Sequence, residues 1–253
     1  MGARASRALA ASTALAAALL CTPAFAADSS MRLDERWHSH PLRDRIFFFA
    51  GGDVASDSAF TWTGFTAAPL GFLEEDGWRV RVAGGGGRYR YRTGNVAGGI
   101  NEANLLSGEF MTGYRFSVGG GTATFYVGAH IENQNLAAPD PGHEAQGAEA
   151  GIKIAVEIYR RFTPQFFGLA SAAASTVHTS YQARAALAYE ISETVAFGLE
   201  AAVNGDERYD EPRAGILVQT TFGRASWSLS GGYLSNSDKG DALYGTLSVY
   251  AVY

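Results

Sequence analysis

An alternation between apolar and polar residues runs through most of this 253-residue chain, and no other feature restricts its fold as strongly. In one segment Phe125 and Val127 alternate with Thr124 and Tyr126. Similar stripes occupy residues 78–92, 107–116, 152–159, 181–190, 195–204, 213–222, 225–233 and 247–253, and the charges of a stripe share one face except in 78–92, where their parity changes. A period of two is the period of β-strands, so the chain is predicted to be all-β.

The lengths of the connections distinguish a membrane barrel from a soluble sandwich. Weaker strands near 46–51, 60–68 and 166–175 bring the expected number to about twelve. Short connections at 119–121, 162–164, 192–193 and 223–224, and a somewhat longer one at 69–77, alternate with longer polar ones around 53–58, 92–101, 133–147, 204–212 and 235–241. This alternation is typical of a transmembrane antiparallel up-and-down β-barrel with both termini periplasmic, whereas a sandwich gives no reason for it.

The N-terminus has the features of a cleaved secretory signal. Arg4 and Arg7 precede an apolar run over 8–20, and Ala24-Phe25-Ala26 forms a small-x-small cleavage site. We therefore divide the chain into a signal peptide (1–26), a periplasmic segment (27–42) and an outer-membrane barrel (43–253). A lipoprotein acylated at Cys21 is disfavoured because the preceding Leu20 is large.

Cleavage after residue 26 would remove the only cysteine and leave an acidic chain. A disulfide and a thiolate metal site are then excluded, no cofactor or other metal site is expected, and a nucleic acid is not expected as a partner.

The last strand fixes an expected inside and outside. Leu247, Val249, Ala251 and Tyr253 share one face, and Ser248, Tyr250 and Val252 share the other. The first face is expected to meet lipid, with the ring of Tyr253 at the height of the membrane interface, where tyrosine is favoured.

A run of four glycines, Gly84–Gly87, interrupts one long stripe. Before the run Arg79 and Arg81 lie on the face opposite Trp78, and after it the parity of the arginines changes. Glycine runs inside strands commonly mark a bulge. We interpret the run as a bulge whose extra residue returns Arg88 and Arg90 to the face of Arg79.

The charged faces of the strands are expected to meet inside the barrel. The predicted lumen network consists of Arg79, Arg81, Arg88, Arg90, Glu109, Arg115, Glu132, Lys153, Glu157, Arg184, Glu190, Glu200 and Arg213. Buried charges must be paired or hydrated, so this set predicts either a salt-bridge plug or the wall of a wet channel.

Other side chains have the chemistry that a polysaccharide would need, because sugars offer apolar ring faces and many hydroxyls. The candidates for glycan contact are Tyr126, Tyr159, Asp140, Asp206, Tyr209 and Asp210. Tyrosine is also common at any barrel rim, and acids in an outer loop are usually solvated.

The evidence for catalysis is weaker. A lipid hydrolase would need a His–Ser pair: His130 has no evident Ser partner in the sequence, His178 lies beside Ser180, and His143 is in a long loop. The cluster Asp206, Glu207, Asp210 and Glu211 could supply paired carboxylates for glycoside hydrolysis.

Several blocks of the sequence resemble those of the cellulose biosynthesis protein BcsS family. They are Phe48-Phe49-Ala50-Gly51-Gly52-Asp53-Val54-Ala55-Ser56-Asp57-Ser58, Glu75-Asp76-Gly77-Trp78-Arg79, Gly85-Gly86-Gly87-Arg88-Tyr89-Arg90-Tyr91, Pro139-Asp140-Pro141-Gly142, Asn204-Gly205-Asp206-Glu207-Arg208-Tyr209-Asp210 and Tyr244-Gly245-Thr246-Leu247. The resemblance implies an outer-membrane β-barrel associated with bacterial cellulose synthesis or secretion, and it brings no catalytic residues with it.

Three hypotheses follow from these patterns. The first is a non-enzymatic outer-membrane barrel that assists cellulose production as a scaffold, a glucan-contact surface or a narrow conduit. Its expected partners are membrane lipid, lipopolysaccharide, and cellulose or its secretion proteins. The alternatives are an outer-membrane lipid or glycan hydrolase and a general small-solute pore.

Overall fold

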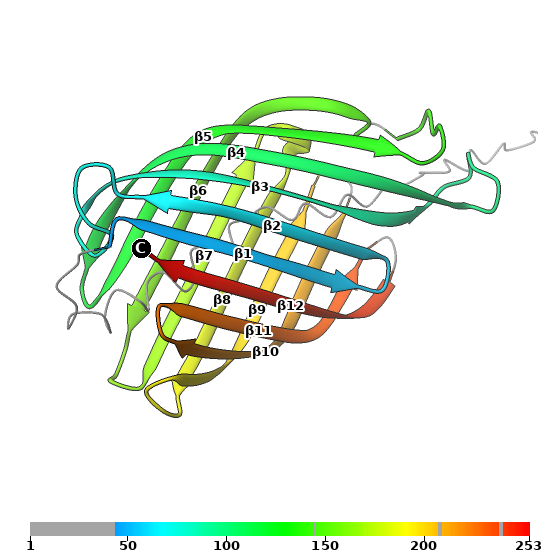
Figure 1. Cartoon of the computed structure of the whole chain (residues 1–253). Coiled ribbons are helices and arrows are strands. Elements are labelled where there is room, and N and C mark those ends of the chain that lie inside the picture. Colours follow the sequence, from blue (N-terminus) through cyan, green and yellow to red (C-terminus); the bar gives the residue numbers. More distant parts are fainter. Residues whose placement is uncertain (1–43, 144, 207–208, 238–239) are drawn as a thin grey trace, which may run out of the picture.

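The computed structural model describes residues 44–143, 145–206, 209–237 and 240–253. They form a closed antiparallel barrel of twelve strands in which each strand pairs with the next and β12 pairs with β1 (Figure 1). The predicted fold class and strand number are therefore confirmed. The predicted signal peptide and the segment 27–42 lie outside the described residues.

The strands are long, as expected for strands that cross a membrane at a tilt. They are β1 Ile46–Ala55, β2 Ser58–Ala67, β3 Gly77–Arg92, β4 Ile100–Val118, β5 Gly121–Leu136, β6 Gly147–Arg161, β7 Phe166–Ser175, β8 Tyr181–Glu190, β9 Val195–Gly205, β10 Asp210–Phe222, β11 Ala225–Asn236 and β12 Gly240–Val252. One short 3-10 turn, η2 Val177–Thr179, lies between β7 and β8. In the part of the chain that the structure describes, no helix is long and apolar enough to span a membrane.

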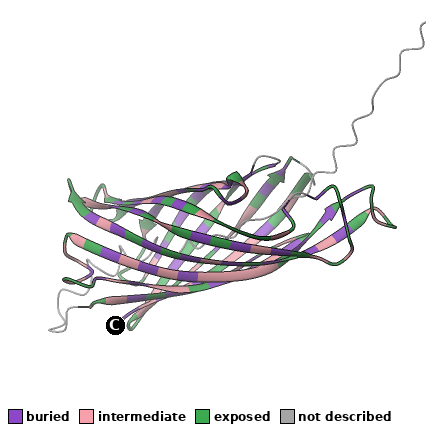
Figure 2. Cartoon of the chain, turned by 90° about the horizontal axis from the view of Figure 1, so that it is seen from above, coloured by how far each residue is buried: buried purple, intermediate pink, exposed green. Residues whose placement is uncertain are grey.

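Burial alternates along each strand, as Figure 2 shows by its bands of colour. On β6 the charged Lys153 and Glu157 are buried, whereas Ile152 and Ile154 are exposed on the outside. On β12 Tyr250 is buried and Leu247 is exposed, so the predicted faces of the last strand are confirmed. The apolar faces therefore point outward and the charged faces point into the lumen, which is the arrangement of a barrel in lipid.

Aromatic rings form part of a belt on the outer surface near the end of the barrel where β1 begins and β12 ends, which we call the end with the termini. Trp78 contacts Tyr114 edge to face at 5.6 Å, and Tyr114 lies 4.8 Å from Phe116. Phe116 in turn contacts Phe125 of β5. Such girdles mark the boundary between hydrocarbon and headgroups in membrane barrels, so this contact series gives the height of one membrane interface.

The connections at the two ends differ less in length than predicted, since the end with the termini includes the nine-residue connection 68–76. Two-residue turns join β4 to β5 and β10 to β11, whereas residues 93–99 and 137–146 form the longest connections at the far end. Three of the predicted long connections are shorter than expected: 206–209 joins β9 to β10, 237–239 joins β11 to β12, and only Ser56 and Asp57 join β1 to β2. There the ladder continues to the tip of the hairpin, so the polar residues near the tip belong to strands.

The predicted bulge in β3 is also wrong. The register with β4 is continuous from Gly77 opposite Arg115 to Arg92 opposite Ile100, with no extra residue. Arg88 and Arg90 are consequently exposed on the outside.

The glycine run instead makes room for aromatic rings. A Cβ on Gly87 would lie 2.3 Å from the Cδ1 atom of Phe60, and one on Gly85 would lie 3.2 Å from the Cβ of Trp62. Both residues belong to β2 and point into the lumen, so the glycines let the ring of Phe60 and the Cβ of Trp62 approach the β3 backbone closely.

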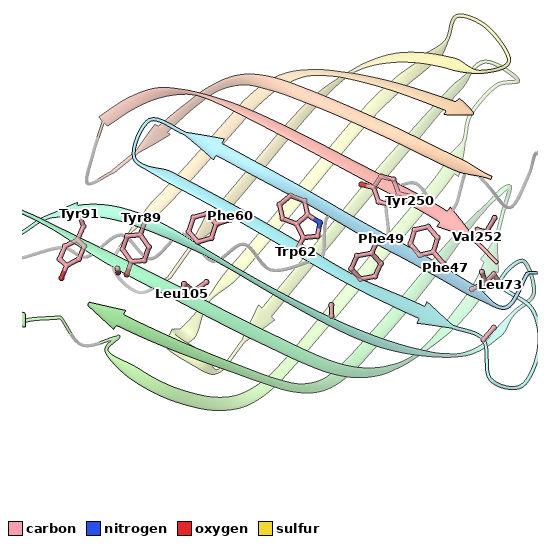
Figure 3. Packing of buried hydrophobic residues seen from close by; sticks show 13 residues of the cluster. Phe47, Phe49, Phe60, Trp62, Leu73, Tyr89, Tyr91, Leu105, Tyr250 and Val252 are labelled. Carbon is pink, nitrogen blue, oxygen red and sulfur yellow. The ribbon is translucent and has the colours of Figure 1, made fainter. Parts of the chain in front are cut away.

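Figure 3 shows these rings as part of a longer row. Tyr91, Tyr89, Phe60, Trp62, Phe49 and Phe47 follow one another along the inner wall formed by β3, β2 and β1. All six are buried, so this side of the lumen is packed with aromatic side chains.

Candidate functional site

The lumen contains ion pairs that connect strands far apart in the barrel. The guanidinium of Arg81 on β3 meets the carboxylate of Glu157 on β6 at 2.7 and 2.9 Å, and the two side chains are 2% and 4% exposed. Arg81 also lies 4.1 Å from the ring centre of Tyr126 and donates from Nε to Thr66. Because β4 and β5 separate these two strands, the pair bridges across the inside of the wall.

A second pair lies beside the first. Lys153 Nζ donates to Glu109 Oε2 at 2.5 Å, and both side chains are 2% exposed. This pair joins β6 to β4, so two cations and two anions neutralise one another within one region of the lumen. Full pairing is what buried charges require, because an uncompensated charge in this environment would cost several kcal/mol, roughly 3–5 for a pair that has lost one partner.

The opposite wall has its own network, centred on Arg213 of β10. Its guanidinium contacts Asp53 of β1 at 2.8 Å and Glu211 at 2.6 Å, and Thr246 of β12 donates to the same Asp53 oxygen. Asp53 was not among the predicted lumen residues. The sequence did contain a signal, since Asp53 falls within the first block that resembles the BcsS family.

Glu200 is the other carboxylate of this wall. It pairs with Arg184 of the neighbouring β8 and accepts a hydrogen bond of 2.8 Å from Tyr244 of β12. A cavity of about 20 Å³ lies among Arg184, Glu200, Arg213 and Tyr244, which is space for roughly one water molecule. The four side chains that surround this cavity are therefore held close to one another.

The remaining predicted lumen residues have more local roles. Arg79 and Arg115 are buried and donate to the backbone carbonyls of Leu73 and Glu75, so they hold the 68–76 connection inside the mouth near the termini. Glu190 pairs with Arg161 near the same end of the barrel.

Glu132 lies toward the other end, where Gln134 donates to it at 2.7 Å and the ring of His178 approaches it at 3.4 Å. Of the thirteen predicted network residues, only Arg88 and Arg90 lie outside the lumen, for the reason given above for β3.

At the end opposite the termini, residues 137–143 of the loop that follows β5 pack against the barrel. Its Asp140 is buried and accepts hydrogen bonds from Asn95 at 2.6 Å and from Tyr91 at 3.2 Å. Its His143 lies 3.2 Å from the hydroxyl of Tyr89. The loop is thus anchored to the row of aromatic rings on β3.

These contacts affect the acidity of Asp140. Burial by itself would raise the pKa of the carboxyl group, but hydrogen bonds from Asn95, Thr93, Gly142 and Tyr91 outweigh it and hold the pKa below the usual value. Asp140 is therefore a charged anchor for the loop at neutral pH.

The six residues proposed for glycan contact do not gather on one accessible surface. Tyr126 and Tyr159 are buried in the lumen, and Asp140, Asp206 and Tyr209 are buried at the end with the long connections. Asp210 is exposed, but it accepts a hydrogen bond from Tyr181 on the outer face. Their present arrangement is that of packing and anchoring groups.

The histidines have partners that the sequence did not reveal. His130 Nδ1 lies 2.9 Å from the hydroxyl of Ser175 on β7, so the expectation that His130 lacks a serine partner is wrong. His178 lies between the carboxylates of Glu132 and Glu149. Ser175 is 45 residues from His130 in sequence, and only the order of strands brings them together. Within the described residues, no group of three or more His, Cys, Asp and Glu side chains is placed to hold a metal ion.

Comparison with solved structures identifies the general fold. LpxR from Salmonella typhimurium aligns with a TM-score of 0.50 and 10% identity over 82% of this chain and 100% of its own. The β domain of the Bordetella autotransporter BrkA gives 0.50 and 12% over 84% and 100%. The transport unit of the autotransporter AIDA-I from Escherichia coli gives 0.50 and 10% over 89% and 97%. At such identities the likeness shows the outer-membrane barrel fold alone.

Sequence comparison is more specific. Among curated proteins, none matches this chain with significant similarity. The profile of cellulose biosynthesis protein BcsS, in contrast, matches residues 47–253, which include every strand of the barrel except the first residue of β1. The chain therefore belongs to the cellulose biosynthesis protein BcsS family.

Proposed function

We propose that this protein is a non-enzymatic scaffold in the outer membrane that assists the production or secretion of cellulose. Membership of the BcsS family supports the link to cellulose, and the barrel fold, with its apolar outer face, supports a location in the outer membrane. Its environment is then membrane lipid and lipopolysaccharide, and its partners are cellulose or the proteins that secrete it.

The single observation that favours a scaffold over a conduit is the state of the lumen charges. Arg81, Glu157, Lys153 and Glu109 are almost completely buried and are paired with one another. A polysaccharide passing through the barrel would need hydroxyl-binding groups exposed along its path, whereas these groups are already satisfied. The row of aromatic rings on the β1–β3 wall is likewise buried.

The test compares a barrel that contains the ion pair Arg81–Glu157 with a barrel that lacks it. In the double variant Arg81→Ala/Glu157→Ala both charges are removed together, so no uncompensated charge remains. The matched control is Arg161→Ala/Glu190→Ala, which removes a less buried pair near the end with the termini. Each variant replaces the wild type in a cellulose-producing strain that otherwise lacks this protein, and each is also studied in planar bilayers.

We expect loss of secreted cellulose in the deletion strain and full rescue by both double variants at equal barrel abundance. We also expect higher bilayer conductance for Arg81→Ala/Glu157→Ala, because its lumen is emptied of two large side chains. If cellulose output changed in parallel with conductance, the protein would be a conduit rather than a scaffold. Unchanged cellulose in the deletion strain would remove the role in cellulose altogether, and steady wild-type conductance in the same experiment would favour a general pore.

The pair His130–Ser175 favours one second candidate, a hydrolase. The 2.9 Å contact is the geometry that a histidine needs to activate a serine hydroxyl. However, Ser175 Oγ also accepts the backbone N–H of Val177, and both side chains are buried in the lumen, away from lipid. We therefore propose that the serine orders the turn after β7. Hydrolysis of lipid A or of cellulose oligomers by the wild type, lost in both His130→Ala and Ser175→Ala, would reverse this proposal.

A further inference from the structure

We propose that Arg88, Arg90 and Arg92 form a binding site for the phosphate groups of lipopolysaccharide in the outer leaflet. The three side chains occupy successive outward positions of β3 and are exposed. Outward positions on one strand are about 7 Å apart, so the guanidinium groups form a short row directed along the strand.

The height of the row agrees with this ligand. Trp78, in the aromatic belt near the termini, lies on the same strand and the same face. A strand tilted by about 40° rises roughly 2.6 Å per residue, so the ten residues from Trp78 to Arg88 span about 26 Å, close to the ~25 Å apolar band of such barrels. Arg88 then lies at the far edge of the hydrocarbon, with Arg90 and Arg92 about 5 and 10 Å beyond it, among the headgroups.

The end that bears the row is expected to face the cell exterior, because the ten-residue connection 137–146, the longest of the barrel, lies there beside 93–99, and outer loops are the longer ones in such barrels. In a Gram-negative outer membrane the outer leaflet consists of lipopolysaccharide, whose lipid A and inner core bear phosphates. Guanidinium groups bind phosphate through two parallel N–H donors, which makes arginine better suited to this anion than lysine.

The immediate surroundings leave the row with an excess of positive charge. Across the ladder, Asn104 lies opposite Arg88, Glu102 opposite Arg90 and Ile100 opposite Arg92. Asp57 is the other acid of this neighbourhood, since its backbone carbonyl accepts the Arg90 N–H. The three arginines thus have two acids in their surroundings, and no described acid forms an ion pair of 4 Å or less with any of the three.

The row is also confined to one side of the barrel. At the same end, the exposed outward charges of β10 and β12 are the acids Asp210 and Asp241. Of the basic strand residues that the structure describes, the remaining outward-facing one is Arg160, which lies on β6 near the termini. A general need for surface charge would distribute arginines around the rim, whereas a site for an anionic headgroup concentrates them.

The experiment uses the full-length barrel purified in detergent micelles. Lipid A bisphosphate is added, its binding is measured by native mass spectrometry, and the same lipid without phosphates serves as the second ligand. The variant is Arg88→Gln/Arg90→Gln/Arg92→Gln, and the matched control is Arg160→Gln, an outward arginine at the other end. The shift in gel mobility on heating verifies that every variant is a folded barrel.

We expect the wild type and Arg160→Gln to bind the phosphorylated lipid equally and to prefer it over the dephosphorylated lipid. Each arginine near a membrane surface contributes about fivefold in affinity, so the triple variant should bind on the order of a hundredfold more weakly and lose that preference. Equal affinity in the triple variant, an equal loss in Arg160→Gln, or an equal loss with the dephosphorylated lipid would each overturn the proposal. Displacement of the lipid by millimolar inorganic phosphate would also overturn it, since the site would then serve a free anion.

Discussion

Breaking the pair between Arg81 and Glu157 should destabilise the barrel far more than breaking a surface pair. Removal of either partner leaves a buried charge without compensation, which costs about 3–5 kcal/mol. The variants Arg81→Ala and Glu157→Ala should each lose stability of that order. Arg81→Ala also loses the contact with the ring of Tyr126, which can contribute up to about 2 kcal/mol when water is excluded.

The double variant separates the pair from its surroundings. We expect Arg81→Ala/Glu157→Ala to be less destabilised than the sum of the single variants by about 2–3 kcal/mol, which is the size of coupling found for residues in direct contact. The control cycle is Arg161 with Glu190, whose side chains are 21% and 13% exposed. Partly exposed pairs contribute little, so a coupling of at most about 1 kcal/mol is expected there.

The measurement is equilibrium unfolding by urea of the refolded barrel in detergent micelles, followed by tryptophan fluorescence. The free energies are extrapolated to zero denaturant, and equal slopes among variants show that the same surface is exposed on unfolding. A coupling below about 0.5 kcal/mol for Arg81 with Glu157 would refute the argument, because it would mean that water reaches this part of the lumen and screens the charges.

Three further perturbations test other parts of the structure. Gly87→Ala should destabilise the barrel by about 1–3 kcal/mol, because its Cβ would meet Phe60. Gly84→Ala should cost less than about 1 kcal/mol, because the nearest atom to its Cβ is 3.3 Å away. Equal urea midpoints of the two variants would contradict the packing of Phe60 on Gly87 and favour the bulge instead. Asp140→Asn should speed proteolysis of the 137–146 loop at neutral pH, because the charged anchor is lost. A carboxyl group whose pKa is depressed in the folded protein stabilises the fold above its normal pKa. In the wild type, proteolysis should therefore accelerate only as the pH falls below 3.8 and through the lowered pKa of Asp140. Ile154→Arg places a charge on the lipid face and should cost about 2–4 kcal/mol in bilayers, which a folding titration in vesicles would measure.

The alternation of residues was sufficient to predict the fold, because in a strand each residue's face follows directly from its position. The face of Tyr250 and the outward position of Leu247 follow from that period alone. The same argument failed at Gly84–Gly87, since a glycine run is compatible both with an inserted residue and with a ring packed against the backbone. Which applies depends on Phe60 and Trp62, residues of another strand whose register the sequence does not specify.

The site was predictable only as a set of residues. The alternation of residues predicted that the charged faces of β3, β4 and β6 point into the lumen, and there the structure pairs Arg81 with Glu157 and Lys153 with Glu109. Their pairing depends on which strands lie within reach across the lumen, and this is a property of barrel size and shear. The partnership of His130 with Ser175 was missed for the same reason, since two strands that are not consecutive in sequence supply the two side chains.

The junction of β1 with β12 has a consequence for the order of folding. Phe47 lies opposite Val252, so the seam that closes the wall joins residues from opposite ends of the described chain. Until this ladder forms, β1 and β12 are both open edges with unpaired backbone groups, which invite pairing with other chains. Contacts of such long sequence separation form slowly. Closure is therefore expected to be the late, rate-limiting step, and an unclosed intermediate is the species most exposed to aggregation and to periplasmic proteases.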